Sequence, residues 1–297
     1  MSTSVARSLP HDLLLASRPL SWINTAFGFA AAYVLSTGRV DATLVIGTLF
    51  FLVPYNLMMY GINDVFDYAS DLANPRKGGA EGAVLPPARH RTVLTWSVLL
   101  SVPFVVALVL LGHPLSWLVL TFSLFAVVAY SVPALRFKEI PFLDSITSSI
   151  HFVSPAVYGL VLAGARPNEP LVILVAAFLA WGVASHAFGA VQDVLPDREA
   201  GIASIATVLG ARRAVRFALA MWVLSGLLML FTSWPGPLGA VVALPYLVAV
   251  WPFRSVTDAE SAQTNRGWRH FLLLNYVCGF LTTMLLIWWA LAGGSAF

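Results

Sequence analysis

The aspartates of this sequence are few and unevenly placed. Only 14 of its 297 residues are acidic, yet Asp64, Asp67 and Asp71 fall in one short stretch directly after Asn63. In a continuing helix the spacing i, i+3, i+7 places all three carboxylates on one face. Like charges in that arrangement repel one another unless a cation lies between them. The group therefore predicts a face that binds a cation.

A second acidic group, Asp193 and Asp197, has the spacing i, i+4 and shares one face if the helix continues through Pro196. Both groups follow apolar segments, so we expect all their carboxylates to converge on one interface. Carboxylate oxygens suit Mg²⁺, which usually binds through carboxylates and substrate phosphates. The single cysteine and the scattered histidines do not indicate zinc or copper. The alternative is that these are ordinary solvated carboxylates beside a membrane.

Basic residues accompany both acidic groups, where an anion would need them. Mg²⁺ that bridges phosphate oxygens, with arginine and lysine neutralising the remaining charge, stabilises a departing pyrophosphate. Basic residues are common in the cytoplasmic loops of any membrane protein, so only their proximity to the aspartates favours this role. The predicted diphosphate-binding residues are Asn63, Arg76, Lys77, Arg136, Lys138 and Arg198.

Polar and aromatic side chains inside the apolar segments are the candidates for a substrate pocket. Polar groups are costly in lipid and tend to face the interior of a helical bundle, and an aromatic face attracts a cation. The alternative is that they form interhelical hydrogen bonds or pack in the core. The candidates are Asn24, Tyr60, Tyr130, His186 and Gln192.

The composition indicates the elements that position these residues. The chain is 59% hydrophobic and 10% charged, with a mean hydropathy of +0.81, whereas soluble domains have about 25% charged residues. The chain is therefore expected to be a membrane protein. A net charge of +3 comes without a nucleic-acid-binding motif, so no nucleic-acid partner is expected. Cys278 is expected to pack in the apolar interior, and the N-terminus lacks a signal-peptide pattern.

Segments of about 20 apolar residues are long enough to cross a bilayer. They predict an all-α membrane protein with nine transmembrane helices in a single domain, residues 1–297. The predicted spans are 13–36, 42–62, 92–111, 115–132, 142–164, 170–192, 213–232, 237–253 and 270–293.

Lysine and arginine indicate the orientation. All of them except Arg39 and Arg166 lie on the N-terminal side or in the loops after the even-numbered spans. Cytoplasmic loops are enriched in these residues. We therefore expect a multi-pass protein of the cell membrane with a cytoplasmic N-terminus, an external C-terminus and the acidic groups on the cytoplasmic side.

The two acidic groups resemble the motifs of the UbiA superfamily of intramembrane prenyltransferases, N-D-x-x-D-x-x-x-D and D-x-x-x-D. The matching residues are Asn63 to Asp71 and Asp193 to Asp197. The family places a diphosphate-binding lysine after the fourth helix, where this chain has Lys138. The resemblance implies nine helices, Mg²⁺ held by the aspartates, and transfer of a prenyl group from an allylic diphosphate to a lipophilic acceptor.

The segment NDVFDYASDLANPRKGGAEGAVLP is most similar to that of the actinobacterial lycopene elongases. That similarity implies dimethylallyl diphosphate as donor and lycopene as acceptor in C50 carotenoid biosynthesis. The allylic C–O bond would ionise and the acceptor alkene would attack, after which the cation loses a proton or captures water. The residue that takes this proton is not identified. The alternative acceptor is a quinone precursor, although no RPL follows the first motif.

Two further hypotheses concern other functions and the donor. A transporter would also have many spans, but its site usually lies at the bilayer midplane between matching halves, and no internal repeat is visible. Tyr55, Met58, Met59 and Tyr60 precede the first acidic group. If these bulky side chains face the bundle they limit the donor tail, which favours a C5 donor; otherwise they only pack.

Overall fold

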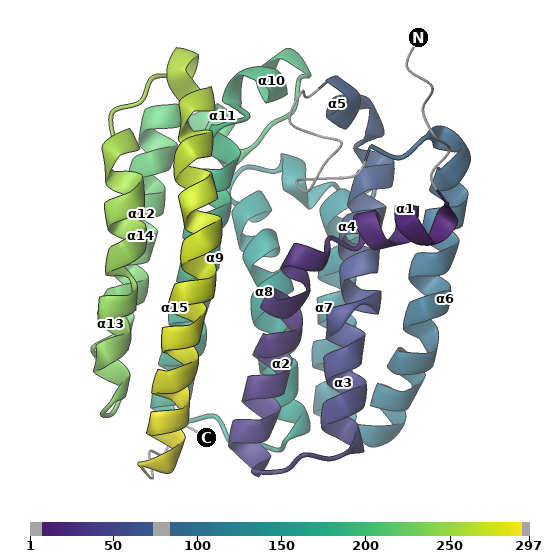
Figure 1. Cartoon of the computed structure of the whole chain (residues 1–297), viewed down its shortest axis with the longest axis vertical. Helices are drawn as coiled ribbons and strands as arrows, with labels where there is room; N and C mark the ends of the chain where they lie inside the picture. The colour runs from purple at the N-terminus through teal and green to yellow at the C-terminus, as the bar shows by residue number, and fades with distance from the viewer. Residues whose placement is uncertain (1–7, 74–83, 293–297) are drawn as a thin grey trace.

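The computed structural model describes residues 8–73 and 84–292, and every element in these ranges is helical. The long helices run side by side, alternately up and down, and form one bundle (Figure 1). The all-α prediction is confirmed for this part of the chain.

The helices follow one another in two halves. The first half comprises α1 (Leu9–Ala16), α2 (Trp22–Thr37), α3 (Ala42–Leu52), α4 (Pro54–Phe66), α5 (Tyr68–Ala73), α6 (Pro87–Leu111), α7 (Pro114–Ser131) and α8 (Leu143–Leu162). The second comprises α9 (Glu169–Val191), α10 (Val194–Glu199), α11 (Ile205–Leu209), α12 (Ala211–Met229), α13 (Gly239–Val242), α14 (Leu244–Val250) and α15 (Asn265–Leu291). Short 3₁₀ turns are η1 (Pro19–Ser21), η2 (Phe137–Glu139), η3 (Gly236–Leu238), η4 (Trp251–Phe253) and η5 (Asp258–Thr264).

Seven helical segments of the described residues are long and apolar enough to cross a membrane. Helices α3 and α4 together make one of them. Helix α2 has only 16 residues, and α12 carries Arg212, Arg213 and Arg216 near its start, so neither is among the seven. The predicted count of nine spans is not confirmed.

The predicted first span, 13–36, is wrong in its extent because the helix breaks at Arg18 and Pro19. Helix α1 ends at Ala16, and α2 begins only at Trp22, after η1. Proline has no N–H to donate and disfavours the helical conformation in the residue before it. Arg18 accordingly has a φ of 48°, in the left-handed region.

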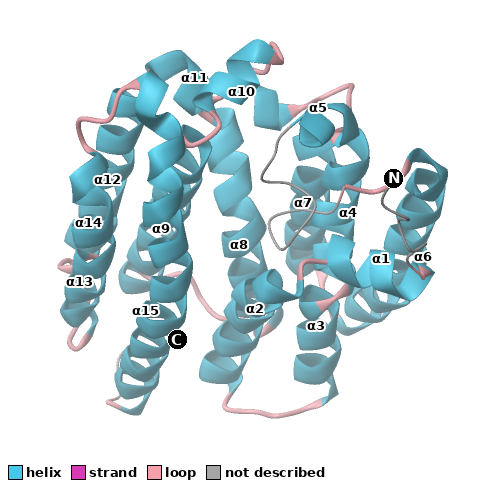
Figure 2. Ribbon diagram, turned by 45° about the horizontal axis from the view of Figure 1, so that its top comes forward, coloured by secondary structure: helices cyan, strands magenta, loops and turns pink. Residues whose placement is uncertain are grey.

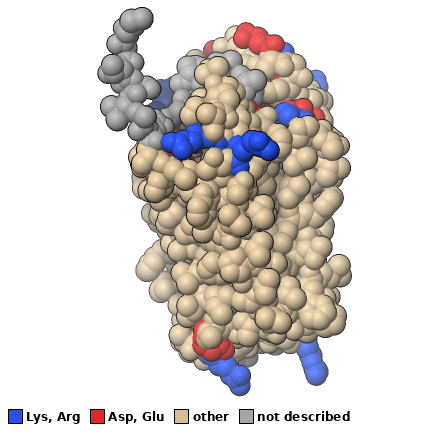
Figure 3. Space-filling view, turned by 90° about the vertical axis from the view of Figure 1, so that its right-hand side faces the viewer, with Lys and Arg blue, Asp and Glu red and all other residues tan. Residues whose placement is uncertain are grey.

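On the face shown in Figure 3, charged side chains gather toward the two ends of the molecule and leave an almost uncharged belt between them. Helix α6 shows what the belt exposes. Val98, Val102 and Val106, one turn apart, are 55%, 50% and 52% exposed. Lipid covers such a surface without the penalty that water imposes. The chain is therefore an integral membrane protein.

Each half of the bundle has an aromatic core. In the first half, Phe29 and Phe51 pack with their ring centroids 5.4 Å apart. In the second, Trp222 stacks on Tyr246 at 5.7 Å with the ring planes 9° apart. Cys278 is a free thiol buried in this second core, so the prediction that it packs in the interior is confirmed.

Helices α8 and α9 join the two halves at close range. A methyl group on Gly182 of α9 would lie 2.1 Å from the Ser149 hydroxyl oxygen of α8, so the absence of a side chain permits this approach. The same hydroxyl donates a 2.9 Å hydrogen bond to the Leu179 carbonyl. This seam brings side chains from the two halves into contact.

Helices α5 and α10 lie at the same end of the bundle (Figures 1 and 2). The chain bends before each of them, at Asp67 (φ −100°, ψ 2°) and at Asp193 (φ −101°, ψ 3°). Helical bonding continues across both bends, since Asp71 N donates to Asp67 O at 2.8 Å and Asp197 N donates to Asp193 O at 2.9 Å. The two acidic groups therefore lie at one end of the bundle, each on a bent helix.

Candidate active site

Asp64, at the end of α4, is completely buried. Its Oδ1 accepts a 2.8 Å hydrogen bond from Nη2 of Arg18. The Arg18 guanidinium also lies 4.2 Å from the centroid of the Tyr60 ring, within the range of a cation–π interaction. A buried charge is costly unless it is paired, and Arg18, in the turn between α1 and η1, provides a positive charge beside Asp64.

Arg18 was not among the residues predicted from the sequence. A signal was present, because a charged residue within an apolar segment is by default a functional candidate. The Nε atom of Arg18 is buried without a hydrogen-bond partner. The guanidinium thus keeps a donor that the described protein atoms do not use.

Asp67, at the bend after α4, is held from three directions. Its Oδ2 accepts from Nδ2 of Asn63 at 2.7 Å, and its Oδ1 accepts from Nζ of Lys138. Arg136 Nη2 lies 3.8 Å from the same Oδ1. Asn63 also donates to the Ser131 hydroxyl at 3.2 Å. The end of α4 and the loop after α7 therefore meet at this carboxylate.

Lys138 belongs to η2, between α7 and α8, and its side chain is only 11% exposed. Burial lowers the pKa of Lys138 to about 8, although the charges of Glu139, Asp197 and Asp64 raise it. Desolvation disfavours the charged ammonium, whereas nearby carboxylates favour it. The ammonium therefore lies within electrostatic range of a carboxylate from each acidic group.

The second acidic group is less enclosed than the first. Asp193 and Asp197 are half-buried, whereas Asp71 of the first group is buried.

Gln192 accepts a 2.7 Å hydrogen bond from Nδ2 of Asn265 and donates a 2.9 Å bond to the Gly189 carbonyl. Gln192 thus ties the end of α9 to the start of α15.

Arg198 is directed to other partners in this structure. Its Nη1 donates a 2.6 Å hydrogen bond to Oδ2 of Asp258, and its Nη2 donates a 2.7 Å bond to the Thr207 carbonyl. Binding a diphosphate would require it to exchange these bonds. Its position after Asp197 therefore does not by itself bring it to the site.

The pocket candidates divide by location. Tyr60 lies against Arg18, and Tyr130 packs edge-on to His186, with the centroids 6.4 Å apart. Asn24 is at an exposed position on α2. The predicted residues Arg76 and Lys77 lie outside the described residues.

The chemistry of the site fits Mg²⁺, but its side chains are not arranged as a preformed cage. Within residues 8–73 and 84–292, no three His, Cys, Asp or Glu side chains are close enough to hold one metal ion. The carboxylates of Asp64 and Asp67 instead contact Arg18 and Lys138. All-oxygen donors suit Mg²⁺, which keeps several waters and shares its coordination with phosphates. If Mg²⁺ bound together with a diphosphate, the metal ion would replace the cations that now contact the carboxylates. The diphosphate would replace the carboxylates that now contact Arg18 and Lys138.

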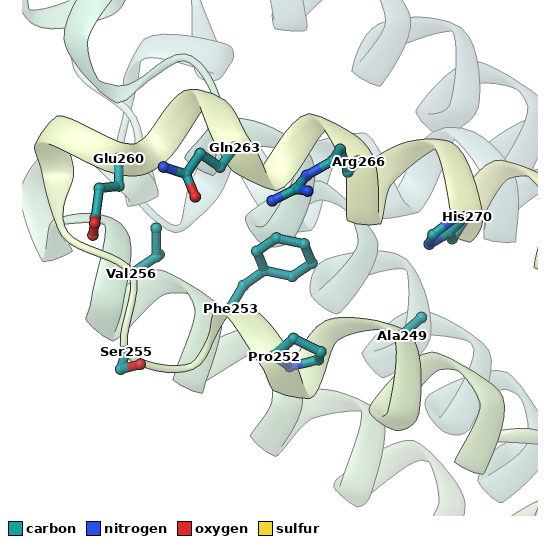
Figure 4. A pocket seen from close by; sticks show the side chains of 9 residues that line it. All are labelled: Ala249, Pro252, Phe253, Ser255, Val256, Glu260, Gln263, Arg266 and His270. Atoms are coloured by element: carbon teal, nitrogen blue, oxygen red, sulfur yellow. The ribbon is translucent and has the colours of Figure 1, made fainter.

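A cavity of about 450 Å³ lies elsewhere, between α14–η4 and η5–α15. Its lining includes Phe253, Glu260, Arg266 and His270 (Figure 4). None of the residues predicted from the sequence lines it. The cavity is therefore separate from the acidic end of α4 and α9.

Known proteins resemble this chain along most of its length. It is 56% identical over 277 residues to the C(50) beta-cyclic carotenoids biosynthesis protein LbtBC of a Dietzia species, a match covering 93% of this chain but 64% of that protein. It is 50% identical over 275 residues to the lycopene elongase/hydratase of Corynebacterium glutamicum, covering 93% of this chain and 96% of that one.

The fold also has solved counterparts. A UbiA homolog from Archaeoglobus fulgidus bound to DMAPP and Mg²⁺ superposes with a TM-score of 0.67, covering 90% of this chain and 98% of that one at 17% identity. At that identity the similarity shows the fold alone. The sequence pattern of the UbiA prenyltransferase family matches residues 23–276. The family motifs, the bundle and the relatives agree, and the chain belongs to the UbiA prenyltransferase family.

Proposed function

We propose that this prenyltransferase transfers a dimethylallyl group from dimethylallyl diphosphate to lycopene, with Mg²⁺, in C50 carotenoid biosynthesis. The observation that carries the proposal is the Lys138 ammonium, whose side chain is only 11% exposed, which contacts Asp67 and lies within electrostatic range of Asp64 and Asp197. A cation that is influenced by carboxylates of both acidic groups suits a diphosphate that binds there together with a metal ion. The lycopene elongase/hydratase relative favours lycopene as the acceptor.

Each side chain at the acidic end has a role in this proposal. Mg²⁺ held by Asp64, Asp67, Asp71, Asp193 and Asp197 would withdraw charge from the diphosphate. Lys138 and Arg18 would then pass from these carboxylates to the phosphate oxygens, as would Arg136. Asn63, which donates to Asp67, would orient that carboxylate. These donors stabilise the negative charge that develops on the leaving group.

The reaction then needs an apolar space behind the diphosphate. The allylic C–O bond breaks, and its electron pair leaves with the diphosphate. The terminal alkene of the acceptor supplies the pair for the new C–C bond. Because water would hydrolyse the allylic cation, the surrounding bundle must exclude it until the acceptor has reacted.

The membrane orientation is part of the proposal. Arginine and lysine are concentrated at the end that bears α5 and α10, so we infer that this end faces the cytoplasm. With α2 and α12 crossing as well, the chain would span nine times, with a cytoplasmic N-terminus and an external C-terminus. The water-soluble donor would then enter from the cytoplasm and lycopene from the lipid.

The test uses the full chain in lipid with dimethylallyl diphosphate, Mg²⁺ and lycopene. The proposal expects pyrophosphate release that depends on Mg²⁺, together with C45 and C50 products by mass spectrometry, scored as alkenes and alcohols. Chelation of Mg²⁺ should abolish both signals. Turnover with a quinone precursor but not with lycopene would reassign the acceptor, and turnover unaffected by chelation would reject the metal.

A further inference from the structure

The seam between α8 and α9 holds a carboxylate outside the two acidic motifs. Asp144, in the first turn of α8, is completely buried. Its Oδ2 lies 3.7 Å from Nε2 of His186 on α9. An ionisable residue at the start of a membrane helix is expensive to bury, which makes it a functional candidate.

Asp144 is held in one position by three hydrogen bonds, which are separate from its contact with His186. Its Oδ1 accepts from the backbone N–H of Ser145 at 2.6 Å and from the Ser145 hydroxyl at 3.2 Å. Its Oδ2 accepts from the backbone N–H of Ile205, in α11, at 2.7 Å. Donors of this kind stabilise an ionised carboxylate. The carboxylate is thus fixed by α8 and α11, and the oxygen that faces His186 is fixed with it.

The His186 side chain is more accessible than its neighbours on α9. Its side chain is 19% exposed, whereas Ala184, Ala187 and Phe188 on the same helix are at most 1% exposed. It lies seven positions before Asp193, a rise of about 10 Å along α9. An isoprenoid chain whose diphosphate is bound at Asp193 would run along this part of the helix. Tyr130 packs edge-on to the ring and lies within electrostatic range of Arg18.

We propose that His186 accepts the proton whose loss ends the prenyl transfer, and that Asp144 is its positioning residue. The inference rests on the proposed function, because it requires a carbocation formed from an allylic diphosphate and an alkene. It concerns the final proton transfer, for which the acidic motifs provide no residue, since in the proposed function their carboxylates hold Mg²⁺.

Attack of the acceptor alkene forms the C–C bond and leaves a tertiary cation. A neighbouring C–H bond breaks, its electron pair forms the new alkene, and the proton goes to the Nδ1 lone pair of His186. Asp144 favours the tautomer with hydrogen on Nε2, which leaves that lone pair available, and then stabilises the imidazolium. When water adds instead, the proton lost by its oxygen goes to the same nitrogen.

His151 provides a matched control within the same bundle. It also packs edge-on to Tyr130, with the ring centroids 5.1 Å apart. Its side chain is buried, and its Nε2 has no hydrogen-bond partner. Replacing His151 therefore tests the loss of a buried imidazole beside Tyr130 that no carboxylate orients.

The experiment compares His186→Gln, Asp144→Asn and His151→Gln with the wild-type chain in lipid, using dimethylallyl diphosphate, Mg²⁺ and lycopene. Products are counted per pyrophosphate released, so that a change in folding or donor binding cancels. His186→Gln should keep releasing pyrophosphate but yield about 10²-fold less of the wild-type product, the lower range for a lost general base. Alkene isomers or quenched by-products should replace it. Asp144→Asn should shift the distribution in the same direction but less.

The outcomes separate the two proposals. A wild-type chain that releases no pyrophosphate would overturn the proposed function and this inference with it. An active wild type would overturn the inference alone if His186→Gln kept the wild-type product distribution, or if His151→Gln changed it equally. If His186→Gln fails to insert into the membrane, Asp144→Asn tests the inference in its place. An unchanged product distribution in Asp144→Asn would reject His186 as the proton acceptor.

Discussion

Arg18 Nη2 donates a 2.8 Å hydrogen bond to Oδ1 of Asp64, and the two residues lie 46 positions apart. The Arg18 side chain is 17% exposed and that of Asp64 is 0% exposed. The pair links the turn after α1 to the end of α4, where the first acidic group begins. A residue outside the aspartate motifs therefore contributes a positive charge to the candidate site.

Removing Arg18 should destabilise the protein, because it takes away a cation that forms a 2.8 Å ion pair with the completely buried carboxylate of Asp64. Breaking a buried ion pair costs about 3–5 kcal/mol. We therefore expect Arg18→Gln to lower the thermal unfolding midpoint, measured in detergent without Mg²⁺. The double variant Arg18→Gln, Asp64→Asn should recover most of the loss. An equal loss in both variants would show that Arg18 acts through packing and not through its charge.

The aspartates of both acidic groups should be required for Mg²⁺-dependent transfer. Asp64→Asn and Asp193→Asn should each lower Mg²⁺-dependent pyrophosphate release by at least about 10²-fold, the scale of a lost electrostatic contact in a transition state. Asp41→Asn is the control, since Asp41 caps α3 by accepting from Leu44 N at 3.0 Å. Near-normal turnover of Asp64→Asn at low Mg²⁺ would contradict the metal assignment.

Lys138 and Arg198 provide a contrast between two basic residues that both adjoin aspartates. Lys138 contacts Asp67, whereas Arg198 contacts Asp258 and the Thr207 carbonyl. Lys138→Met should therefore raise the KM for the donor and lower kcat. Arg198→Met should affect mainly the thermal midpoint. Steady-state kinetics with varied dimethylallyl diphosphate would decide, and equal kinetic losses would place Arg198 at the diphosphate.

Much of the candidate site could be proposed from local spacing. Asp64, Asp67 and Asp71 follow a helical period, and Lys138 follows from the family resemblance. Arg18 could not be found this way, because its partner is distant in sequence and the break at Pro19 interrupts an apolar run that appears continuous. The pairing of Asp144 with His186 was missed for a similar reason, since it depends on how closely α8 approaches α9.

The fold was predictable as far as hydropathy determines it. The apolar segments and the helical class follow from composition, because lipid requires internally satisfied backbone. Helix boundaries depend on local breaks. Helix α2 is shortened by the turn before it, and the arginines of α12 reduce its apolar length. These features explain why the number of crossings does not follow from length and composition alone.

The orientation can be tested with two exposed positions at opposite ends. Ala200, after α10, is exposed, and Val40, between α2 and α3, is 82% exposed. In a Cys278→Ala background, Ala200→Cys should react with an impermeant thiol reagent only from the cytoplasmic side, and Val40→Cys only from outside. The reverse pattern would overturn both the orientation and the access of the site to cytosolic diphosphate.

Donor length should be limited by Tyr60 and not by Tyr55 or Met59. Tyr55 is 0% exposed, and Met59 is 4% exposed within the core of the first half. Tyr55 also donates a hydrogen bond to the His151 carbonyl at 3.2 Å. Tyr60 instead lies against the Arg18 guanidinium, beside Asp64. Of these three side chains, it is the one that adjoins the proposed diphosphate site.

With lycopene as acceptor, the wild-type chain should therefore use a C5 diphosphate better than C10, C15 and C20 diphosphates. Tyr60→Leu should raise the C20-to-C5 ratio of kcat/KM, because it shortens the side chain beside the tail. Tyr55→Phe is the control, since it removes a hydroxyl from the core without opening space near Asp64. Comparable wild-type turnover with C5 and C20 donors would refute a steric limit. A ratio unchanged by Tyr60→Leu would place the limit at another side chain.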